Sequence, residues 1–246
     1  MAAPVLEARG IEKHYAGFTA LRGVDLAVRF GMVHGLIGPN GSGKSTLLNA
    51  MAGSVLPDRG TITLAGADVT RLPPHQRVRR GLSITFQVTS IVAGLSAYDN
   101  VLLALQARGS WPTLMRSGTR RGLHEDVVRS LRQFNLLHQA DSIAGGLSHG
   151  EQQWLELAMA MATRPRVLLL DEPTGGMSIE ERRITGQLLA RAKEHTAILI
   201  VEHDLDFIRT LCDVVTVLHE GAVLDEGTPE YIASSEAVRR VYVTRA

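Results

Sequence analysis

The chain has 246 residues, and its 26 Lys and Arg residues nearly balance its 25 Asp and Glu residues, which gives a formal net charge of +1. This balance argues against a strongly basic nucleic-acid surface or a polybasic membrane anchor, and the length suits one large domain, which we expect, or two small ones. The one cysteine, Cys212, excludes an intrachain disulfide and indicates a packed thiol in a reducing compartment, so we expect a cytosolic protein.

The sequence contains no recognisable targeting or membrane-spanning segment. Met1–Gly10 lacks the basic-then-apolar pattern of a signal peptide. The longest apolar runs are far shorter than the ~20 residues that span a bilayer. If the protein works at a membrane, we therefore expect another chain to bring it there.

The N-terminal part is predicted to be rich in β-structure. Val5–Tyr15 and Ala20–Arg29 alternate well enough to be antiparallel strands, and Thr61–Leu64 is a further short strand between turn sequences. The apolar run Met32–Ile37 indicates a buried strand, and Leu82–Phe86 is an apolar run that ends at Gln87.

The residues after Ile37 fit the phosphate-binding pattern G-x-x-x-x-G-K-[ST] at every required position. They are Gly38, Pro39, Asn40, Gly41, Ser42, Gly43, Lys44, Ser45 and Thr46. Glycines allow positive φ, so successive N–H groups and the start of the next helix, Lys44–Ala52, converge on the β- and γ-phosphates. Lys44 adds a positive charge, and Ser45 adds a hydroxyl ligand for Mg²⁺. The weaker alternative is a glycine-rich turn that caps an ordinary helix.

From Gln87 to about Ala162 the apolar period becomes helical. The spacing of Ser96 and Asp99 is a capping pattern for a helix through Val101–Leu105. Within this helical region, residues 108–121 are basic and contain Gly, Ser and Pro. This composition favours a solvated loop over a partner-binding segment.

The C-terminal half is predicted to alternate strands and helices. Val167–Leu170 and Ala197–Val201 are continuous apolar runs, which suit strands covered on both faces of a parallel sheet, and Ser178–Lys193 is the helix between them. Val214–Leu218 and Ala222–Asp225 flank a turn. A last helix is expected from Thr228 and Pro229 through Val241.

Two carboxylates follow one of these strands directly. Asp171 and Glu172 end the run that starts at Val167, and the carboxyl edge of a parallel sheet is also where the phosphate loop would lie. Asp171 could therefore hold Mg²⁺, directly or through water, and Glu172 could orient an attacking water. Acids after a strand are also common in helix-entry loops, so the interpretation depends on the phosphate loop.

Two further polar residues follow strands, and each has a plain alternative explanation. His203 could donate a hydrogen bond to the γ-phosphate, or it could be a half-buried histidine that caps a turn with Asp204. Gln87 could contact Mg²⁺ or the water through its amide, or it could be an ordinary surface glutamine.

Leu147–Glu151 opens a helix with a sequence that serves two purposes. Ser148 and Glu151 form a capping box, which is a sufficient structural reason for both residues. A serine beside Gly150 at a helix N-terminus is also an anion site, because free N–H groups and the helix dipole point the same way.

Together these motifs resemble the ATP-binding subunit of ABC transporters, over about Val5 to Val243. In the resemblance, Gly38–Thr46 is the Walker A loop, Gln87 the Q-loop, Leu147–Glu151 the signature, Val167–Glu172 the Walker B strand, Gly175–Ser178 the D-loop and His203 the switch histidine. Tyr15 stands where the family places an aromatic that stacks on adenine. The sequence departs from the family pattern at His149, Glu151 and Ser178. Ser178 stands in place of the usual D-loop Asp, a residue that the resemblance links to signalling between two sites.

The resemblance implies an α/β fold with a RecA-like core, an antiparallel β-subdomain and an α-helical subdomain at about 88–162, all within one nucleotide-binding domain at 5–243. It implies ATP and Mg²⁺ as ligands. It also implies head-to-tail dimers in which the Walker A loop of one subunit and Ser148 and Gly150 of the other enclose one ATP.

Within the family, the chain is similar to subunits that serve urea and branched-chain amino acid importers, and the urea type is the closer likeness. This similarity lies in the amino-acid sequences of the signature, the D-loop and the segment after Val201. That resemblance implies a heterodimer with a second ATP-binding chain, two membrane permease subunits and, indirectly, a solute-binding protein. We expect Val88–Leu95 to be the surface that docks on the membrane subunits. The rival functions are a lipopolysaccharide exporter ATPase, a soluble ABC ATPase acting on ribosomes or DNA, and a small-molecule kinase.

Overall fold

The computed structural model describes residues 3–85, 90–107 and 119–243, which form two β-sheets surrounded by helices. The smaller sheet is antiparallel and has the strand order β2-β1-β4-β5. Its strands are β1 (Leu6–Tyr15), β2 (Phe18–Val28), β4 (Arg59–Leu64) and β5 (Ala67–Asp68). The predicted antiparallel pairing of the N-terminal strands is confirmed, with Ala16 and Gly17 as the hairpin turn.

The larger sheet has the order β10-β9-β3-β8-β7-β6. Its strands are β3 (Val33–Ile37), β6 (Leu82–Thr85), β7 (Val167–Asp171), β8 (Ala197–Val201), β9 (Val214–His219) and β10 (Ala222–Gly227). All neighbouring pairs are parallel except β9 with β10, which are antiparallel at one edge. Every residue of β3 and β8 is buried. The continuous apolar runs therefore belong to strands covered on both faces, as the sequence predicts.

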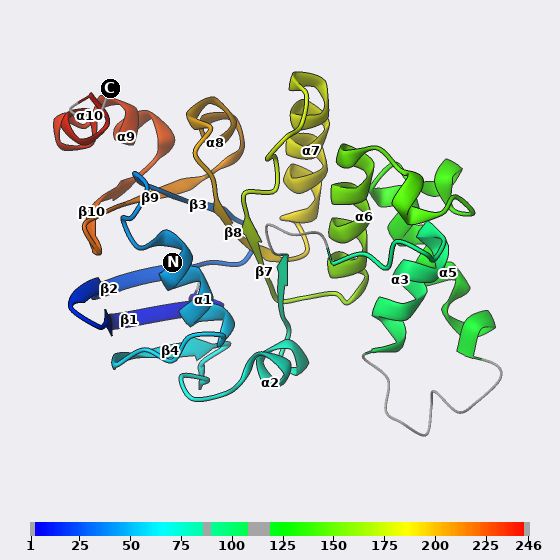
Figure 1. Cartoon of the computed structure of the whole chain (residues 1–246), viewed down its shortest axis with the longest axis horizontal. Helices are drawn as coiled ribbons and strands as arrows, with labels where there is room; N and C mark the ends of the chain where they lie inside the picture. The colour runs from blue at the N-terminus through cyan, green and yellow to red at the C-terminus, as the bar shows by residue number, and fades with distance from the viewer. Residues whose placement is uncertain (1–2, 86–89, 108–118, 244–246) are drawn as a thin grey trace.

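The helices divide into one group around the larger sheet and another group at one side. They are α1 (Lys44–Ala52), α2 (Pro74–Arg79), α3 (Ala97–Gln106), α5 (Thr119–Gln133), α6 (His149–Ala162), α7 (Ile179–Ala192), α8 (Leu205–Leu211), α9 (Pro229–Ser234) and α10 (Glu236–Val243). Figure 1 shows α3, α5 and α6 together on the side away from β1, β2 and β4, and these three helices contact one another. None of the helices in the described ranges combines the length and the apolar character needed to cross a membrane.

Two apolar clusters cover the two faces of the larger sheet. On one face, Val167 and Leu169 of β7 pack with α1 and with the smaller sheet. On the other face, Leu168 and Leu170 pack with α6, α7 and α8. This alternation follows the period of two in a strand. Cys212 is buried in the second cluster, which confirms the packed thiol that the sequence predicts.

Two local expectations are wrong, and one helix was not predicted. The last helix is broken at Ser235, whose backbone is extended and whose Oγ donates to Asp225 Oδ2 at 2.6 Å, so α9 and α10 are separate. The residues directly after Leu64, which the sequence predicts as a turn, contain β5, and this strand pairs with the end of β4. Helix α2 was not expected at all, because it buries a charged residue, Arg77, in place of an apolar stripe.

Arg77 closes the C-terminal end of α1 from inside the molecule. Its side chain is 1% exposed, and its Nη1 donates to the carbonyls of Ala50 and Met51, each at 2.7 Å. Its Nε and Nη2 donate to the carbonyls of Leu72 and Thr70, each at 2.9 Å. A guanidinium therefore satisfies carbonyls that the last turn of a helix leaves without intrahelical donors.

Candidate functional site

The phosphate loop joins the C-terminal end of β3 to α1, as the sequence predicts. Gly38, Gly41 and Gly43 all have positive φ values, of 151°, 81° and 104°. A Cβ atom at Gly38 would collide with the carbonyl oxygen of Leu218, and one at Gly43 would lie 2.7 Å from the carbonyl oxygen of Ala20. Glycine is therefore required at Gly38 and Gly43 by packing as well as by backbone conformation.

The loop is shaped to receive an anion. Helix α1 begins at Lys44 without any side-chain cap and without an acidic residue in its first turn. Lys44 Nζ donates to the carbonyl oxygens of Gly38 and Pro39, at 2.7 and 3.1 Å, so the ammonium group is held over the loop. Burial lowers the pKa of Lys44. Within the described ranges, Ser42 Oγ is buried without a hydrogen-bond partner. Uncapped N–H groups, a held cation and an unsatisfied hydroxyl all fit a bound phosphate chain.

Two carboxylates lie beside this loop, at the end of β7. Asp171 pairs with Val201 at the same level of the sheet, and it is half-buried. Burial and the neighbouring Glu172 raise the pKa of Asp171, whereas Lys44 opposes the shift. Glu172 has a φ of 51°, which a residue with a side chain rarely adopts, and its N–H donates to the carbonyl of Val201 at 2.9 Å. Such conformations are concentrated at functional sites.

His203 reaches Glu172 from the neighbouring strand. It follows β8, and its Nδ1 lies 3.5 Å from Glu172 Oε1. The imidazole is exposed, so the alternative of a half-buried histidine does not hold. Asp204 caps α8 by accepting from the N–H groups of Asp206 and Phe207. These neighbouring residues therefore have different roles: Asp204 caps α8, and His203 faces the carboxylate of Glu172.

Sequence reasoning missed the contribution of Glu202. This carboxylate is 1% exposed. Its Oε1 accepts from the N–H of Thr174 at 3.0 Å and from the hydroxyl of Thr174 at 2.6 Å. Its Oε2 accepts from the N–H of His203 at 3.2 Å. Glu202 therefore ties the segment after Glu172 to the one that carries His203. Its position directly after a buried strand, next to a candidate histidine, was the signal that could have identified it.

Other predicted site residues lie away from this cluster. Tyr15 ends β1 at the tip of the β1–β2 hairpin. Ser148 caps α6, accepting from the N–H of Glu151 at 3.3 Å while the Glu151 carboxylate accepts from the N–H of Ser148. In Figure 1, α6, which Ser148 caps, and α1, which follows the phosphate loop, lie on opposite sides of β7. Gln87 lies outside the described residues.

The starts of α6 and α7 pack directly against each other. A Cβ at Gly150 would collide with the carboxylate of Glu181, and the ring of His149 lies 3.5 Å from the position of a Cβ at Gly176. Ser178 caps α7 in a second capping box with Glu181. The unusual residues His149 and Ser178 therefore belong to adjoining helix starts.

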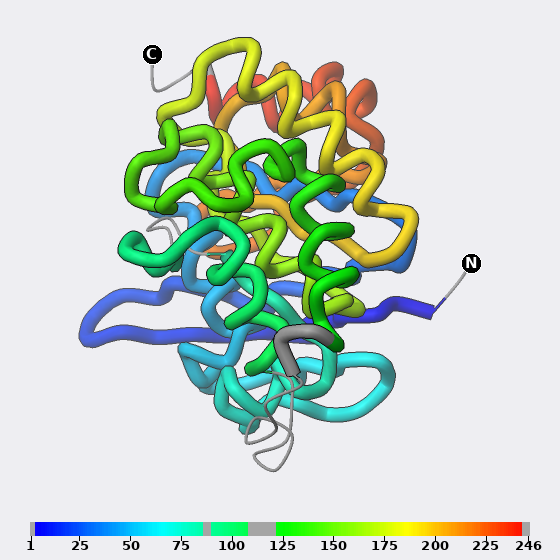
Figure 2. The backbone as a smooth tube through the Cα atoms, turned by 90° about the vertical axis from the view of Figure 1, so that its right-hand side faces the viewer, coloured from blue at the N-terminus to red at the C-terminus, as the bar shows by residue number. Residues whose placement is uncertain are grey.

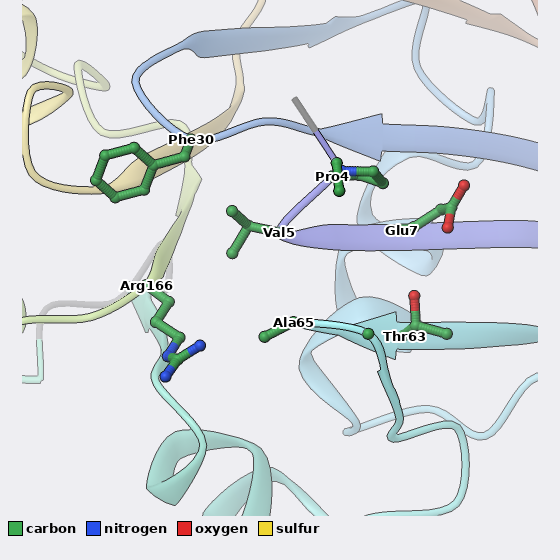
Figure 3. A pocket seen from close by; sticks show the side chains of 9 residues that line it. Pro4, Val5, Glu7, Phe30, Thr63, Ala65 and Arg166 are labelled. Carbon is green, nitrogen blue, oxygen red and sulfur yellow. The ribbon is translucent and has the colours of Figure 1, made fainter. Parts of the chain in front are cut away.

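A cavity of about 610 Å³ lies elsewhere in the molecule. Figure 3 shows Val5, Phe30, Ala65 and Arg166 around it. Arg166 directly precedes β7, so the cavity is at the end of this strand opposite to Asp171. The candidate site is therefore the cluster that includes Lys44, Glu172 and His203, and this cavity is not part of it.

The small number of acidic side chains at the phosphate loop suits Mg²⁺. Within the described ranges, no three His, Cys, Asp or Glu side chains gather into a metal-binding group. Mg²⁺ is usually held by one or two protein oxygens together with substrate phosphates and water. Ser45, exposed at the start of α1, and Asp171 provide such oxygens.

Comparisons with known proteins agree with this arrangement. A family model described as ABC transporter matches residues 21–175. The chain is 34% identical to the high-affinity branched-chain amino acid transport ATP-binding protein BraF of Pseudomonas aeruginosa, over the full length of both chains. It is 36% identical to the lipopolysaccharide export system ATP-binding protein LptB of Acidithiobacillus ferridurans, over 97% of this chain and 96% of LptB. Among solved structures, the ADP conformation of an ATP-binding cassette of an ABC transporter matches with a TM-score of 0.88 and 28% identity, covering 98% of this chain and 99% of the cassette.

Proposed function

The chain belongs to the ABC transporter ATP-binding family, and from this premise we propose that it drives the uptake of branched-chain amino acids or urea through separate membrane subunits. The family hydrolyses ATP and binds it with Mg²⁺. Full-length similarity to BraF supports a branched-chain amino acid importer. The similarity to LptB keeps lipopolysaccharide export as the alternative.

The observation that carries the proposed chemistry is the convergence of Lys44, Glu172 and His203 at one edge of the parallel sheet. Burial lowers the pKa of Lys44, and the nearby Glu172 and Asp171 act in the opposite direction, so both carboxylates lie within electrostatic reach of the ammonium group. His203 Nδ1 is 3.5 Å from Glu172 Oε1. A cation can bind phosphate, a carboxylate can orient water, and an imidazole beside that carboxylate can donate a hydrogen bond, so this set of groups is suited to phosphoryl transfer to water.

The proposed roles follow from these positions. The N–H groups of residues 38–46 and the Lys44 ammonium hold the β- and γ-phosphates. Ser45 and Asp171 would hold Mg²⁺, which would supply positive charge to offset that of the phosphate oxygens. Glu172 orients a water and accepts its proton as the water oxygen bonds to the γ-phosphorus and the bond to the bridging oxygen breaks. His203 donates a hydrogen bond to the γ-phosphate, and we also assign Gln87 to the water or Mg²⁺.

The partners are proposed from the family. Its members form dimers and work with membrane permease subunits. We propose that residues 5–243 form the nucleotide-binding domain, with about 88–162 as its helical subdomain, on the cytoplasmic face of the membrane. Ser148 and Gly150 would then complete the site of a second ATP-binding chain, so that closure of the dimer encloses ATP. A solute-binding protein completes the proposed importer.

The proposed docking surface for the permease is Val88–Leu95, of which Ser90–Leu95 lies within the described residues. The N–H of Ser90 donates to Glu156 Oε1 of α6 at 3.3 Å, and the N–H of Val92 donates to Asn100 Oδ1 of α3 at 2.7 Å. Val92 and Leu95 are exposed. A surface tied to α6 in this way would pass a displacement of the permease to Ser148 at the start of that helix.

Replacing Glu172 tests the proposed chemistry. Glu172→Gln should bind ATP with Mg²⁺ near normally but lose hydrolysis by about 10²-fold or more, since the amide cannot accept the proton. Glu125→Gln, an exposed change on α5, is the matched control and should hydrolyse at the normal rate. Normal turnover by Glu172→Gln would exclude Glu172 as the base.

Purification of the complex tests the transport function. The tagged chain would be isolated from its native membrane in mild detergent, identified with its partners by mass spectrometry, and assayed for ATPase activity with leucine or urea on the cognate binding protein. Two membrane subunits, a second ATP-binding chain and stimulation by one of these solutes are the expected result. Lipid-export components in their place would show that the export alternative is correct.

A further inference from the structure

The tip of the β1–β2 hairpin carries two exposed aromatic side chains. Tyr15 is 43% exposed and Phe18 is 57% exposed. Their ring centroids lie 6.2 Å apart with an angle of 15° between the ring planes, so the rings are stacked with an offset. Figure 2 shows the tip of this hairpin, in dark blue, protruding at the edge of the molecule. Exposed aromatic rings offer flat apolar faces on which another ring can stack.

The strand that carries Phe18 packs directly on the phosphate loop. A Cβ at Gly43 would lie 2.7 Å from the carbonyl oxygen of Ala20. The N–H of Gly221 donates to the carbonyl of Ser42 at 3.0 Å, and the carbonyl of Gly221 accepts from the N–H of Arg22 at 2.8 Å. Phe18 is only two residues before Ala20, or about 7 Å along a strand. A nucleoside that extends from phosphates at Gly43 therefore has Phe18 within reach.

One neighbour of Tyr15 is a held cation. Lys13 Nζ lies 5.5 Å from the centroid of the Tyr15 ring and donates to Asp58 Oδ1 at 2.9 Å. Asp58 also accepts from the N–H of His14 at 2.6 Å. These bonds lower the pKa of Asp58 to about 2, with the N–H of His14 as the largest cause. The end of β1 is therefore fixed to the turn before β4, while Phe18 remains the more exposed of the two rings.

We propose that Phe18 is a second base-stacking residue of the nucleotide site, sharing the base of ATP with Tyr15. The proposal rests on the proposed phosphate site, because the distance from Gly43 places the base at the hairpin tip. A phenyl ring offers only its π-face and no hydrogen bond. Phe18 therefore contributes affinity for the base through stacking, and it contributes nothing to the binding of the phosphate chain alone.

The test compares ATP with a ligand that has no base. Calorimetry would measure the dissociation constants of ATP and of inorganic tripolyphosphate, each with Mg²⁺, for the wild-type chain and for Phe18→Ala. Loss of the Phe18 ring should weaken ATP binding by about tenfold, which corresponds to about 1.4 kcal/mol. The dissociation constant of tripolyphosphate should change by less than about twofold. Phe18→Tyr should restore ATP affinity to near the wild-type value.

Phe30→Ala is the matched control. Phe30 is 52% exposed but lines the distant cavity in Figure 3, so its removal should leave both ligands unaffected. ATP binding by Phe18→Ala within about twofold of wild type, or equal weakening of ATP and tripolyphosphate, would overturn the proposal. Lys44→Ala tests the phosphate site separately, because it should weaken the binding of both ATP and tripolyphosphate. If Lys44→Ala weakens both ligands but Phe18→Ala does not weaken ATP selectively, the phosphate site is correct and the Phe18 assignment is wrong. If wild type binds neither ligand, both fail.

Discussion

Replacing Arg77 should destabilise the protein more than any other change to a single charged side chain on α2. Arg77→Met keeps most of the volume but removes all four hydrogen bonds to main-chain carbonyls. Ala50 keeps a second donor, because the N–H of Gly53 lies 3.1 Å from its carbonyl oxygen. Within the described ranges, the carbonyls of Met51, Thr70 and Leu72 have no other hydrogen-bond donor.

The expected loss follows from these three carbonyls. A buried acceptor left without a donor costs about 1–3 kcal/mol, and the Met51 bond is buried while those to Thr70 and Leu72 are only part-buried and cost less, so the three together give about 3 kcal/mol. Burial lowers the pKa of Arg77 to about 10, so the guanidinium is still charged at neutral pH, and its removal recovers part of the cost of burying that charge. We therefore expect a net loss of about 2–3 kcal/mol, which is a large share of the roughly 5–15 kcal/mol that stabilises a typical protein.

Urea denaturation of the nucleotide-free chain would measure this loss as a shift of the midpoint at unchanged slope. Arg79→Met is the matched control, because Arg79 is exposed on the same helix. The control should unfold at the wild-type midpoint. A loss below about 1 kcal/mol for Arg77→Met would show that water or relaxation of α1 replaces the guanidinium, and the reasoning would be wrong.

Three further outcomes are expected. Burial raises the pKa of Asp171, so protonation of this carboxyl stabilises the folded state relative to the unfolded one. The stabilisation is fully present below the ordinary pKa of 3.8 and is lost as the pH rises through the raised pKa. Asp171→Asn should therefore raise the Tm of the nucleotide-free protein near neutral pH but not near ~pH 3, and a lower Tm at neutral pH would contradict this. Gly43→Ala, whose Cβ would lie 2.7 Å from the Ala20 carbonyl, should abolish ATP binding in calorimetry, whereas Gly41→Ala, with open space around it, should retain measurable binding despite its positive φ. Ser148→Arg should leave ATP binding by the isolated chain intact and stop hydrolysis by the assembled complex; continued hydrolysis would show that Ser148 does not face the partner's nucleotide.

The parts of the fold that the sequence predicts correctly share a physical reason. β8 and residues 167–170 of β7 are apolar throughout because both faces of the sheet are covered, and β3 is equally buried although it contains His34, whose ring is hydrogen-bonded to the Thr216 hydroxyl. Ser148 caps α6 as expected, and Ser178 caps α7 at the start of the predicted helix, since a capping box is formed by residues three apart and needs no distant partner. Helix α1 ends at Ala52 as expected, because Gly53, with a φ of 90°, follows it as the C-cap.

The parts that could not be predicted depend on distant contacts. Arg77 is buried because carbonyls 26 and 27 residues away accept its hydrogen bonds, and no local pattern shows this. Glu202 likewise acts through Thr174, 28 residues away in the sequence. Ser235 breaks the last helix because Asp225 on β10 accepts its hydroxyl. The sequence assigns Glu172 to the attacking water and His203 to the γ-phosphate, but it does not predict their 3.5 Å separation, which is set by the register of β7 and β8.

The packing of Cys212 makes the natural chain a suitable background for fluorescent labelling. Its Sγ and the side chain of Ile208 fill the space beside Gly35, and burial raises the pKa of the thiol to about 12, so almost no reactive thiolate forms at neutral pH. Because this is the only cysteine, a new cysteine at an exposed position would react alone, without removal of the native one. Dyes at Glu125 on α5 and at Arg59 on β4 would then report, as a change in energy transfer, how far the helical side moves relative to the smaller sheet during each ATP cycle.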